Sequence, residues 1–188
     1  MTLWAWALAE RHLARELPRR WAHVQGVARL GSRVGREILA AVDHDVLVAA
    51  ALLHDIGYAA TLVDTGYHPL DGARFLAGEH HEPHLARLVA NHSAARFVAE
   101  IRGLGDELSA FPDERTALRD ALWYSDMRIS PGGEPVTFDE RIAEIRVRHG
   151  SGSVLVRALD AGALDARWDA VRRTEQRLAE AAAVRERV

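Results

Sequence analysis

The chain has 188 residues, a net charge of −3 and no cysteine, and 48% of its residues are hydrophobic and 27% charged. This composition is typical of one globular domain that buries about 70% of the surface of its unfolded chain, and it excludes an intrinsically disordered protein. The lack of cysteine excludes disulfides and thiolate metal sites, so any bound metal needs imidazole and carboxylate ligands.

Charge and hydropathy also set expectations for location and partners. All 24 basic residues are arginine, and the slightly acidic net charge argues against a long nucleic acid as partner. The N-terminal segment has charged residues within a helical pattern and does not resemble a secretory signal. The longest strictly apolar run, 46–53, is too short to cross a membrane. We therefore expect a cytoplasmic protein.

Apolar residues recur at helical spacing almost everywhere, which predicts an all-α fold in a single domain over 1–188. The first three predicted helices cover 3–17, 19–30 and 44–56.

Breaker and capping residues give the bounds of these three helices. Pro18 stops the first, and the region of Gly31 and Gly35 ends the second. Asp43 is the expected N-cap of the third, and Gly57 closes it.

The second half of the chain continues the helical pattern. Pro69 and Pro83 suit first turns of helices, and Thr137 and Glu140 have the spacing of a capping box. A loop is expected over 130–133. The predicted helices here cover 69–77, 83–92, 113–129, 137–148 and 165–187.

We expect the C-terminal helices, 137–187, to pack on a core over about 19–130 that holds the chemistry. The last helix has four apolar residues that would pack on the body of the domain or on a second subunit of a homodimer: Trp168, Val171, Leu178 and Ala182.

The dipeptide His-Asp occurs twice, in different contexts. His44-Asp45 stands at a predicted helix start, so we interpret this pair as a solvent-exposed structural cap. His54-Asp55 instead continues the apolar stripe of its helix. Two ionisable residues at the inner end of an apolar helix need compensating partners.

Four further candidates share this inward placement. His23, His92 and Asp126 lie on the apolar faces of their helices, and His68 stands at the mouth of the helix that Pro69 begins. Each residue alone is more often a satisfied core residue than a ligand.

Several imidazoles and two carboxylates that face one interior would be costly without a cation, so the set predicts a metal site. Such ligands suit two divalent ions bridged by Asp55; iron and manganese are the first expectation, and zinc, magnesium and nickel are further candidates. The remaining histidines are expected in a solvated loop or on the surface: His80, His81, His84, His12 and His149.

The order His23, His54-Asp55, His68, His92 and Asp126 resembles the HD-domain superfamily of metal-dependent phosphohydrolases in its six-ligand form. The resemblance covers about 20–129 and is most specific over 52–57. It implies a helical bundle in which the first histidine, the His-Asp pair and the last aspartate hold one metal. The two middle histidines would complete a second site that shares Asp55.

Departures from the family's branches narrow the expected substrate. The cyclic-di-GMP phosphodiesterases have lysine where this chain has Tyr58, and the alarmone hydrolases have a Glu-Asp pair that is missing after Gly57. The chain is most similar to small bacterial HD hydrolases, which include enzymes that cleave dinucleoside polyphosphates.

The resemblance implies hydrolysis of a phosphoester or phosphoanhydride, in a nucleotide or another small phosphorylated metabolite. A hydroxide shared by the two metals would attack phosphorus, with Asp55 and Asp126 as ligands that orient it. Arg20 and Arg96 are the candidates for binding phosphate oxygens. Two alternatives stay open: a di-iron HD oxygenase with the same ligands, and a regulatory or binding module with a structural metal.

Overall fold

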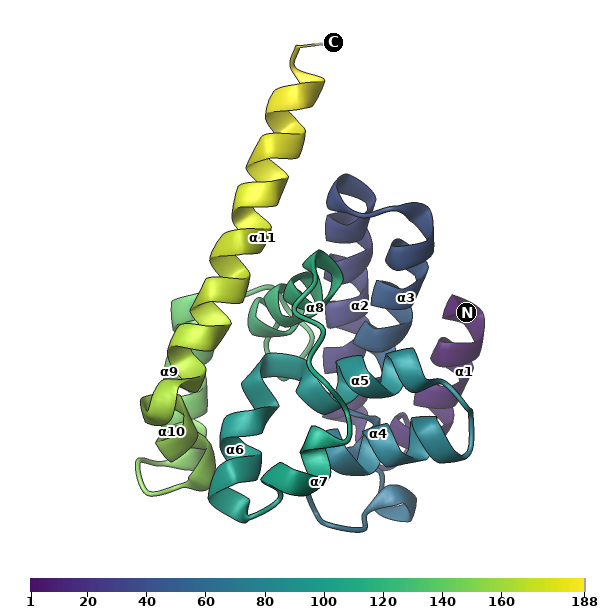
Figure 1. Cartoon of the computed structure of the whole chain (residues 1–188), viewed down its shortest axis with the longest axis vertical. Helices are drawn as coiled ribbons and strands as arrows, with labels where there is room; N and C mark the ends of the chain where they lie inside the picture. The colour runs from purple at the N-terminus through teal and green to yellow at the C-terminus, as the bar shows by residue number, and fades with distance from the viewer. Residues whose placement is uncertain (188) are drawn as a thin grey trace.

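The computed structural model describes residues 1–187, in which helices are the regular elements and no strand occurs beyond one isolated bridge (Figure 1). The all-α prediction is confirmed. The α-helices are α1 (Thr2–Leu13), α2 (Pro18–Ile38), α3 (Ala41–Leu53), α4 (His68–Gly78), α5 (Pro83–Asn91), α6 (Ala95–Arg102), α7 (Gly105–Ser109), α8 (Ala117–Met127), α9 (Phe138–His149), α10 (Val154–Ala158) and α11 (Leu164–Arg185).

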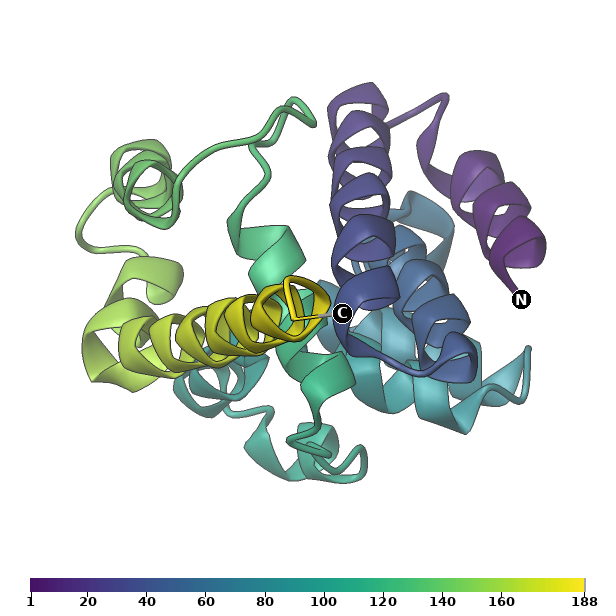
Figure 2. The same cartoon turned by 90° about the horizontal axis from the view of Figure 1, so that it is seen from above.

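The helix α3 is the centre of the core. All its residues from Val46 to Leu53 are buried, because α1, α2, α5 and α8 pack around it. In Figure 2, α1 lies on one side of the molecule and α9 to α11 on the other. The apolar run 46–53 is thus the buried part of the central helix. Within the described residues no helix is long and apolar enough to cross a membrane.

The prediction that glycines end the second helix near residue 30 is wrong, because α2 continues to Ile38. Gly31 and Gly35 face the neighbouring α3: a Cβ at Gly35 would lie 3.2 Å from Leu47, and one at Gly31 would lie 3.6 Å from it. The two glycines therefore allow α2 and α3 to pack closely rather than terminating the helix.

Two predicted helix starts also differ from the structure. Asp43 is in the first turn of α3, and the N-cap is Ala40, so the carboxylate favours the helix dipole without capping an amide. The helix α8 begins four residues later than expected, because Thr116 accepts a hydrogen bond from the backbone N–H of Arg119. The capping box of Thr137 and Glu140 is present as predicted.

A sharp break separates α5 from α6, and the sequence did not predict it. Ser93 and Ala94 have φ angles of 47° and 60°, in the left-handed region that residues with a Cβ rarely adopt. Strain of this kind often marks a functional site, and Ser93 follows His92 directly. The short α6, α7 and α10 were not predicted either.

The long α11 packs on α8 and also contacts α2, and its C-terminal turns project beyond the rest of the molecule (Figure 1). Val171 is buried and Leu178 packs against the core, whereas Trp168 is 42% exposed and contacts the ring of Phe138. Most of the apolar face of α11 therefore packs against other residues of this chain.

Asp120, which is 1% exposed, anchors α11 to α8 by accepting hydrogen bonds from Arg173 and Arg177, and it also pairs with Arg119. We expect Asp120→Ala to lower the free energy of unfolding by about 2 kcal/mol, less than for a fully buried pair because both α11 arginines are partly exposed. Urea unfolding measures this change. Asp169→Ala, at an exposed pair on the same helix, should change it little.

The contribution of Asp120 should also depend on pH. Burial alone would raise the pKa of this carboxyl, but Arg173 and Arg177 outweigh burial and lower it. A carboxyl whose pKa is lower in the folded than in the unfolded protein stabilises the fold at pH values above the unfolded pKa, which is about 3.9 for aspartate. This stabilisation is lost as the pH falls from that value toward the folded pKa. The stability difference between wild type and Asp120→Ala should therefore shrink only below about pH 4; an unchanged difference at pH 3 would contradict this explanation.

Candidate metal centre

Six histidine and aspartate side chains from distant parts of the chain meet in the interior and form two groups of three. The ligand atoms of each group lie within 4.8 Å of one another. The groups are His23, His54 and Asp126, and Asp55, His68 and His92. The structure thus brings together all six residues that the sequence singled out as ligands.

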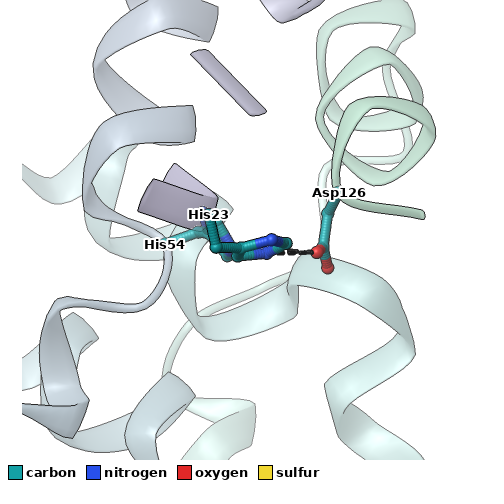
Figure 3. Close-up of side chains that lie close together, drawn as sticks. All are labelled: His23, His54 and Asp126. Carbon is teal, nitrogen blue, oxygen red and sulfur yellow. Dashed lines mark hydrogen bonds and ion pairs between the residues drawn. The ribbon is translucent and has the colours of Figure 1, made fainter. Parts of the chain in front are cut away.

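Most of the six side chains stand at or beside a helix end, where the backbone changes direction. His54 and Asp55 follow α3, His68 begins α4, His92 follows α5, Asp126 lies in the last turn of α8, and His23 lies within α2. All except His68 are buried, with at most 6% of their surface exposed. Figure 3 shows the rings of His23 and His54 pointing together toward the carboxylate of Asp126.

The carboxylate of Asp55 lies between the two groups. Its Oδ2 is 3.3 Å from Nε2 of His54, and its Oδ1 is 3.2 Å from Nε2 of His68. Each oxygen therefore faces a different histidine set, which is the placement that a bridging carboxylate needs.

Backbone carbonyls orient three of the imidazoles. A carbonyl only accepts, so the Nδ1 atom of each ring is the donor, and its Nε2 atom faces the cluster. The bonds run from His23 to Ser130 (2.9 Å), from His54 to Ala51 (2.8 Å) and from His92 to Val89 (2.6 Å). This support at the far nitrogen is the usual arrangement of histidines that bind a metal.

Asp126 is held on both sides. Its Oδ1 lies 3.0 Å from Nε2 of His23, and its Oδ2 accepts a hydrogen bond from the hydroxyl of Ser93. The left-handed conformation of Ser93 thus has a consequence in the cluster, because it directs this hydroxyl at the carboxylate.

The electrostatics of the cluster favour charged carboxylates and one charged imidazole. Burial disfavours a protonated His54, but Asp55 and Asp126 outweigh burial and raise its pKa to about 8. Burial, with His54 and His68 nearby, lowers the pKa of His92 to about 3. The pKa values of Asp55 and Asp126 are held well below their usual range, Asp55 by Arg20 and His54 and Asp126 by His23 and His54, although burial alone would raise both.

The residues fit a divalent metal. Nε2 of His54 is buried and has no hydrogen-bond partner among residues 1–187, and Nε2 of His68 lies only 3.2 Å from Nε2 of His92. A cation would replace the proton of His54, accept the Nε2 lone pairs of the imidazoles and compensate the buried carboxylates. Four imidazoles and two carboxylates suit iron, manganese or zinc better than the oxygen-preferring magnesium.

Metal binding is expected to strengthen as the pH rises from 6 to 8 and then to level off. A metal must displace the proton of His54, so below its pKa of about 8 the affinity should change about tenfold per pH unit. Competition with a chromophoric chelator across this range measures the change. The exposed-histidine variant His81→Gln should give the same profile, and a flat wild-type profile would contradict the assignment of His54.

Beside the cluster lies a pocket of about 550 Å³, a size typical of small-molecule sites. Its polar lining includes both aspartates of the cluster and five arginines: Arg20, Arg102, Arg141, Arg148 and Arg167. Its apolar lining includes Val98, Met127, Ile145, Val154 and Leu155. The pocket therefore offers a cationic surface and an apolar surface next to the ligands.

Arg20, predicted to bind phosphate, lies in this pocket. Its Nη1 donates a hydrogen bond of 2.7 Å to Oδ2 of Asp55, and its guanidinium lies 4.2 Å from the ring centre of Tyr58. Tyr58 in turn stacks on His68, with ring centres 3.9 Å apart. Tyr58 thus positions both a ligand and an arginine.

Arg96, the other predicted phosphate-binding residue, is not brought to the cluster. Its guanidinium lies over the ring of Phe97, and it lines a separate cavity of about 290 Å³ with Glu100. The prediction rested on the position of Arg96 four residues after His92, a separation that brings two side chains together only on a continuous helix. The left-handed Ser93 redirects the chain between α5 and α6.

The other histidines stay outside the two groups, with more contacts than the prediction gave them. His84 lies in α5 and is 2.9 Å from Glu114, and His80 contacts the rings of Trp4 and Phe75. In the second His-Asp pair, His44 bonds to Ser32, and the pair is within α3 rather than at its cap.

Several residues of the site were not predicted from the sequence. Ser93 bonds to the candidate ligand Asp126, and three arginines come from the C-terminal helices. His149 is exposed, as predicted, and its place in the lining of the pocket was not predicted. The spacing of Arg141 and Arg148, seven residues apart on one helix face, was a usable signal. No local pattern marks Arg167.

Comparison with known proteins gives one match. The family described as HD domain matches residues 20–122, which is more than half of the chain. The match ends shortly before Asp126 and does not include α9 to α11. No curated protein and no solved structure matches the chain significantly.

Proposed function

The chain belongs to the HD-domain family, and from this premise we propose that it is a phosphohydrolase that cleaves a phosphoester or phosphoanhydride in a nucleotide or similar small metabolite. Metal-dependent hydrolysis is the general activity of this family. The observation that carries the proposal is the position of Asp55 between two histidine sets, at the base of a pocket lined by five arginines.

We propose that His23, His54, Asp55 and Asp126 hold one metal, and that His68 and His92 hold a second one that shares Asp55. Iron or manganese is the preferred occupant, with zinc next. When bound, the two ions activate water and neutralise the charge that develops on the phosphoryl group.

The remaining steps fall to this chain's own residues. Arg20 contacts Asp55 and Tyr58 beside the cluster, and in this proposal it donates hydrogen bonds to phosphoryl oxygens. Ser93 keeps the carboxylate of Asp126 in position. The apolar part of the pocket would receive the organic part of the substrate and exclude water from it.

Metal analysis of the purified protein, combined with a panel of nucleotides and phosphoesters in anaerobic buffer, tests this proposal. We expect about two metal ions per chain and metal-dependent phosphate release from at least one compound class. A di-iron oxygenase would instead consume oxygen with an organic substrate and release no phosphate. A metal-loaded protein that is inert in both assays would indicate a binding or regulatory module.

A further inference from the structure

The wall of the pocket that faces the metal ligands comes from helices outside the matched family region. Arg141 and Arg148 lie on α9 and Arg167 lies on α11, beyond the end of the match at residue 122. The apolar residue Ile145 also lies on α9, and Leu155 lies on α10. One third of the residues that line the pocket thus come from α9 to α11.

Arg167 is a buried cation with no carboxylate partner among residues 1–187. It is 5% exposed, and its one hydrogen bond, of 2.8 Å, runs from Nε to the carbonyl of Ser93. Its Nη1 atom is buried without a partner. Burial lowers the pKa of Arg167 to about 10, which still leaves it charged at neutral pH.

A second buried arginine of this protein shows how unusual this state is. Arg119 is 7% exposed, and it is neutralised by Asp113 at 2.5 Å and by Asp120 at 3.0 Å. A buried charge without such compensation is costly. Arg167 has the burial of Arg119 but not its carboxylates, which points to an anion that arrives with a ligand.

Arg141, on α9, is also buried, and its guanidinium is only partly satisfied. It is 6% exposed, its Nη1 pairs with Glu144 at 2.6 Å, and its Nε is buried without a partner among the described residues. Its Nη2 lies 3.9 Å from Oδ1 of Asp126, which is beyond hydrogen-bond distance. Asp126 is already bonded to His23 and Ser93, so neutralising this aspartate does not account for Arg141.

The charge of the pocket exceeds what its own carboxylates balance. Five arginines line it together with Asp55 and Asp126, and outside its lining Glu144 pairs with both Arg141 and Arg148. The whole chain has a net charge of −3, so this excess of positive charge is local. A single phosphate group has too few oxygens to engage five guanidinium groups while it also contacts metals.

We propose that Arg141 and Arg167 form an anion-binding subsite that selects substrates with a second phosphate group linked to the one that reacts. This inference rests on the proposed function for the position of the reacting group, but the subsite itself depends only on this chain's arginines. Arg148, at the rim of the pocket, extends the subsite toward solvent.

Calorimetric titration of the metal-loaded protein with inorganic phosphate and with pyrophosphate tests the subsite. We expect wild type to bind pyrophosphate at least tenfold more tightly than phosphate. Arg141→Gln and Arg167→Gln should each weaken pyrophosphate binding about tenfold or more, and weaken phosphate binding less. Equal affinities of wild type for the two anions, or variants that bind pyrophosphate like wild type, would overturn the proposal.

Control variants separate this effect from loss of structure. Arg172→Gln changes an arginine of α11 that is 63% exposed and pairs only with Asp169, so pyrophosphate binding should not change. If Arg167→Gln fails to fold, Arg148→Gln serves in its place, because its side chain is 36% exposed and its loss should still weaken pyrophosphate binding about threefold.

The outcomes distinguish this inference from the proposed function. Pyrophosphate binding that requires Arg141 and Arg167, without hydrolysis of any compound, would support the subsite and contradict the phosphohydrolase. Hydrolysis of nucleoside diphosphates or triphosphates that is unaffected in both variants would support the phosphohydrolase and overturn the subsite.

Discussion

Asp55→Ala is expected to abolish both metal binding and hydrolysis. Its two oxygens face different histidine sets, at 3.3 Å from His54 and 3.2 Å from His68, so removing the carboxylate affects both proposed metal positions at once. The loss of affinity should exceed the roughly 10–100-fold that removal of a supporting residue around a ligand costs. Metal analysis and the rate of phosphate release measure the two effects.

Two further variants make this experiment specific. Asp45→Ala changes the aspartate of the other His-Asp pair, whose side chain is 63% exposed, and both readouts should stay at the wild-type level. Asp55→Asn keeps the size of the side chain and should fold even if loss of the partner of Arg20 destabilises the alanine variant. Full metal content in folded Asp55→Asn would refute the bridging role.

Gly57→Ala is expected to cause the largest loss of stability of any single methyl group added near the site. A Cβ at this position would lie 2.2 Å from the carbonyl oxygen of His68 and 2.6 Å from the backbone nitrogen of Gly72. Both contacts are with backbone, which cannot move aside without displacing α4. We expect a cost of about 3 kcal/mol or more, toward the upper end of overpacking effects, and a decrease in Tm of about 6–12 °C.

Thermal unfolding, followed by circular dichroism, checks this value, and Gly78→Ala is the matched control. Gly78 ends the same helix α4, and a Cβ there would meet nothing within 4 Å, so the change should be close to zero. Because Gly57 also sets the distance between Asp55 and His68, metal affinity should fall in the variant. A Tm within 2 °C of wild type would show that the close approach is not required.

Hydrophobic spacing was sufficient to predict the fold class and most long helices, because their buried faces are continuous in sequence. The apolar run 46–53, for example, is the buried part of α3. Capping residues were a second local signal, since the capping box of Thr137 is present as predicted. Gly31 and Gly35 misled the prediction, since a glycine that allows close helix packing and one that ends a helix look alike in sequence. Only the position of α3 against α2 distinguishes them.

The ligand cluster was accessible from sequence for a different reason. Polar residues that interrupt apolar faces, such as His54 and His92, are costly to bury, and their shared inward direction predicted that they meet. Arg96 was misplaced because helical counting fails across the left-handed Ser93, a conformation that no local pattern indicates.

The cationic wall could not be predicted, because Arg167 joins the site only through tertiary packing. Arg167 is 41 residues beyond Asp126 in the chain, and its helix is fixed by bonds from Arg173 and Arg177 to Asp120. Nothing around Arg167 in sequence differs from an exposed arginine. Prediction from sequence was therefore good for polar residues that are unusual on an apolar helix face, such as His54. It was poor for residues that look ordinary in their local sequence, such as Arg167.

The division of the pocket between two stretches of chain has a consequence for how its selectivity can change. Every proposed ligand precedes residue 127, whereas the wall with Arg141 and Arg167 follows it. Exchanging the segment α9–α11 between relatives is therefore expected to change which substrate is bound and to leave the proposed metal ligands unchanged. This segment is the one to graft when selectivity is to be altered.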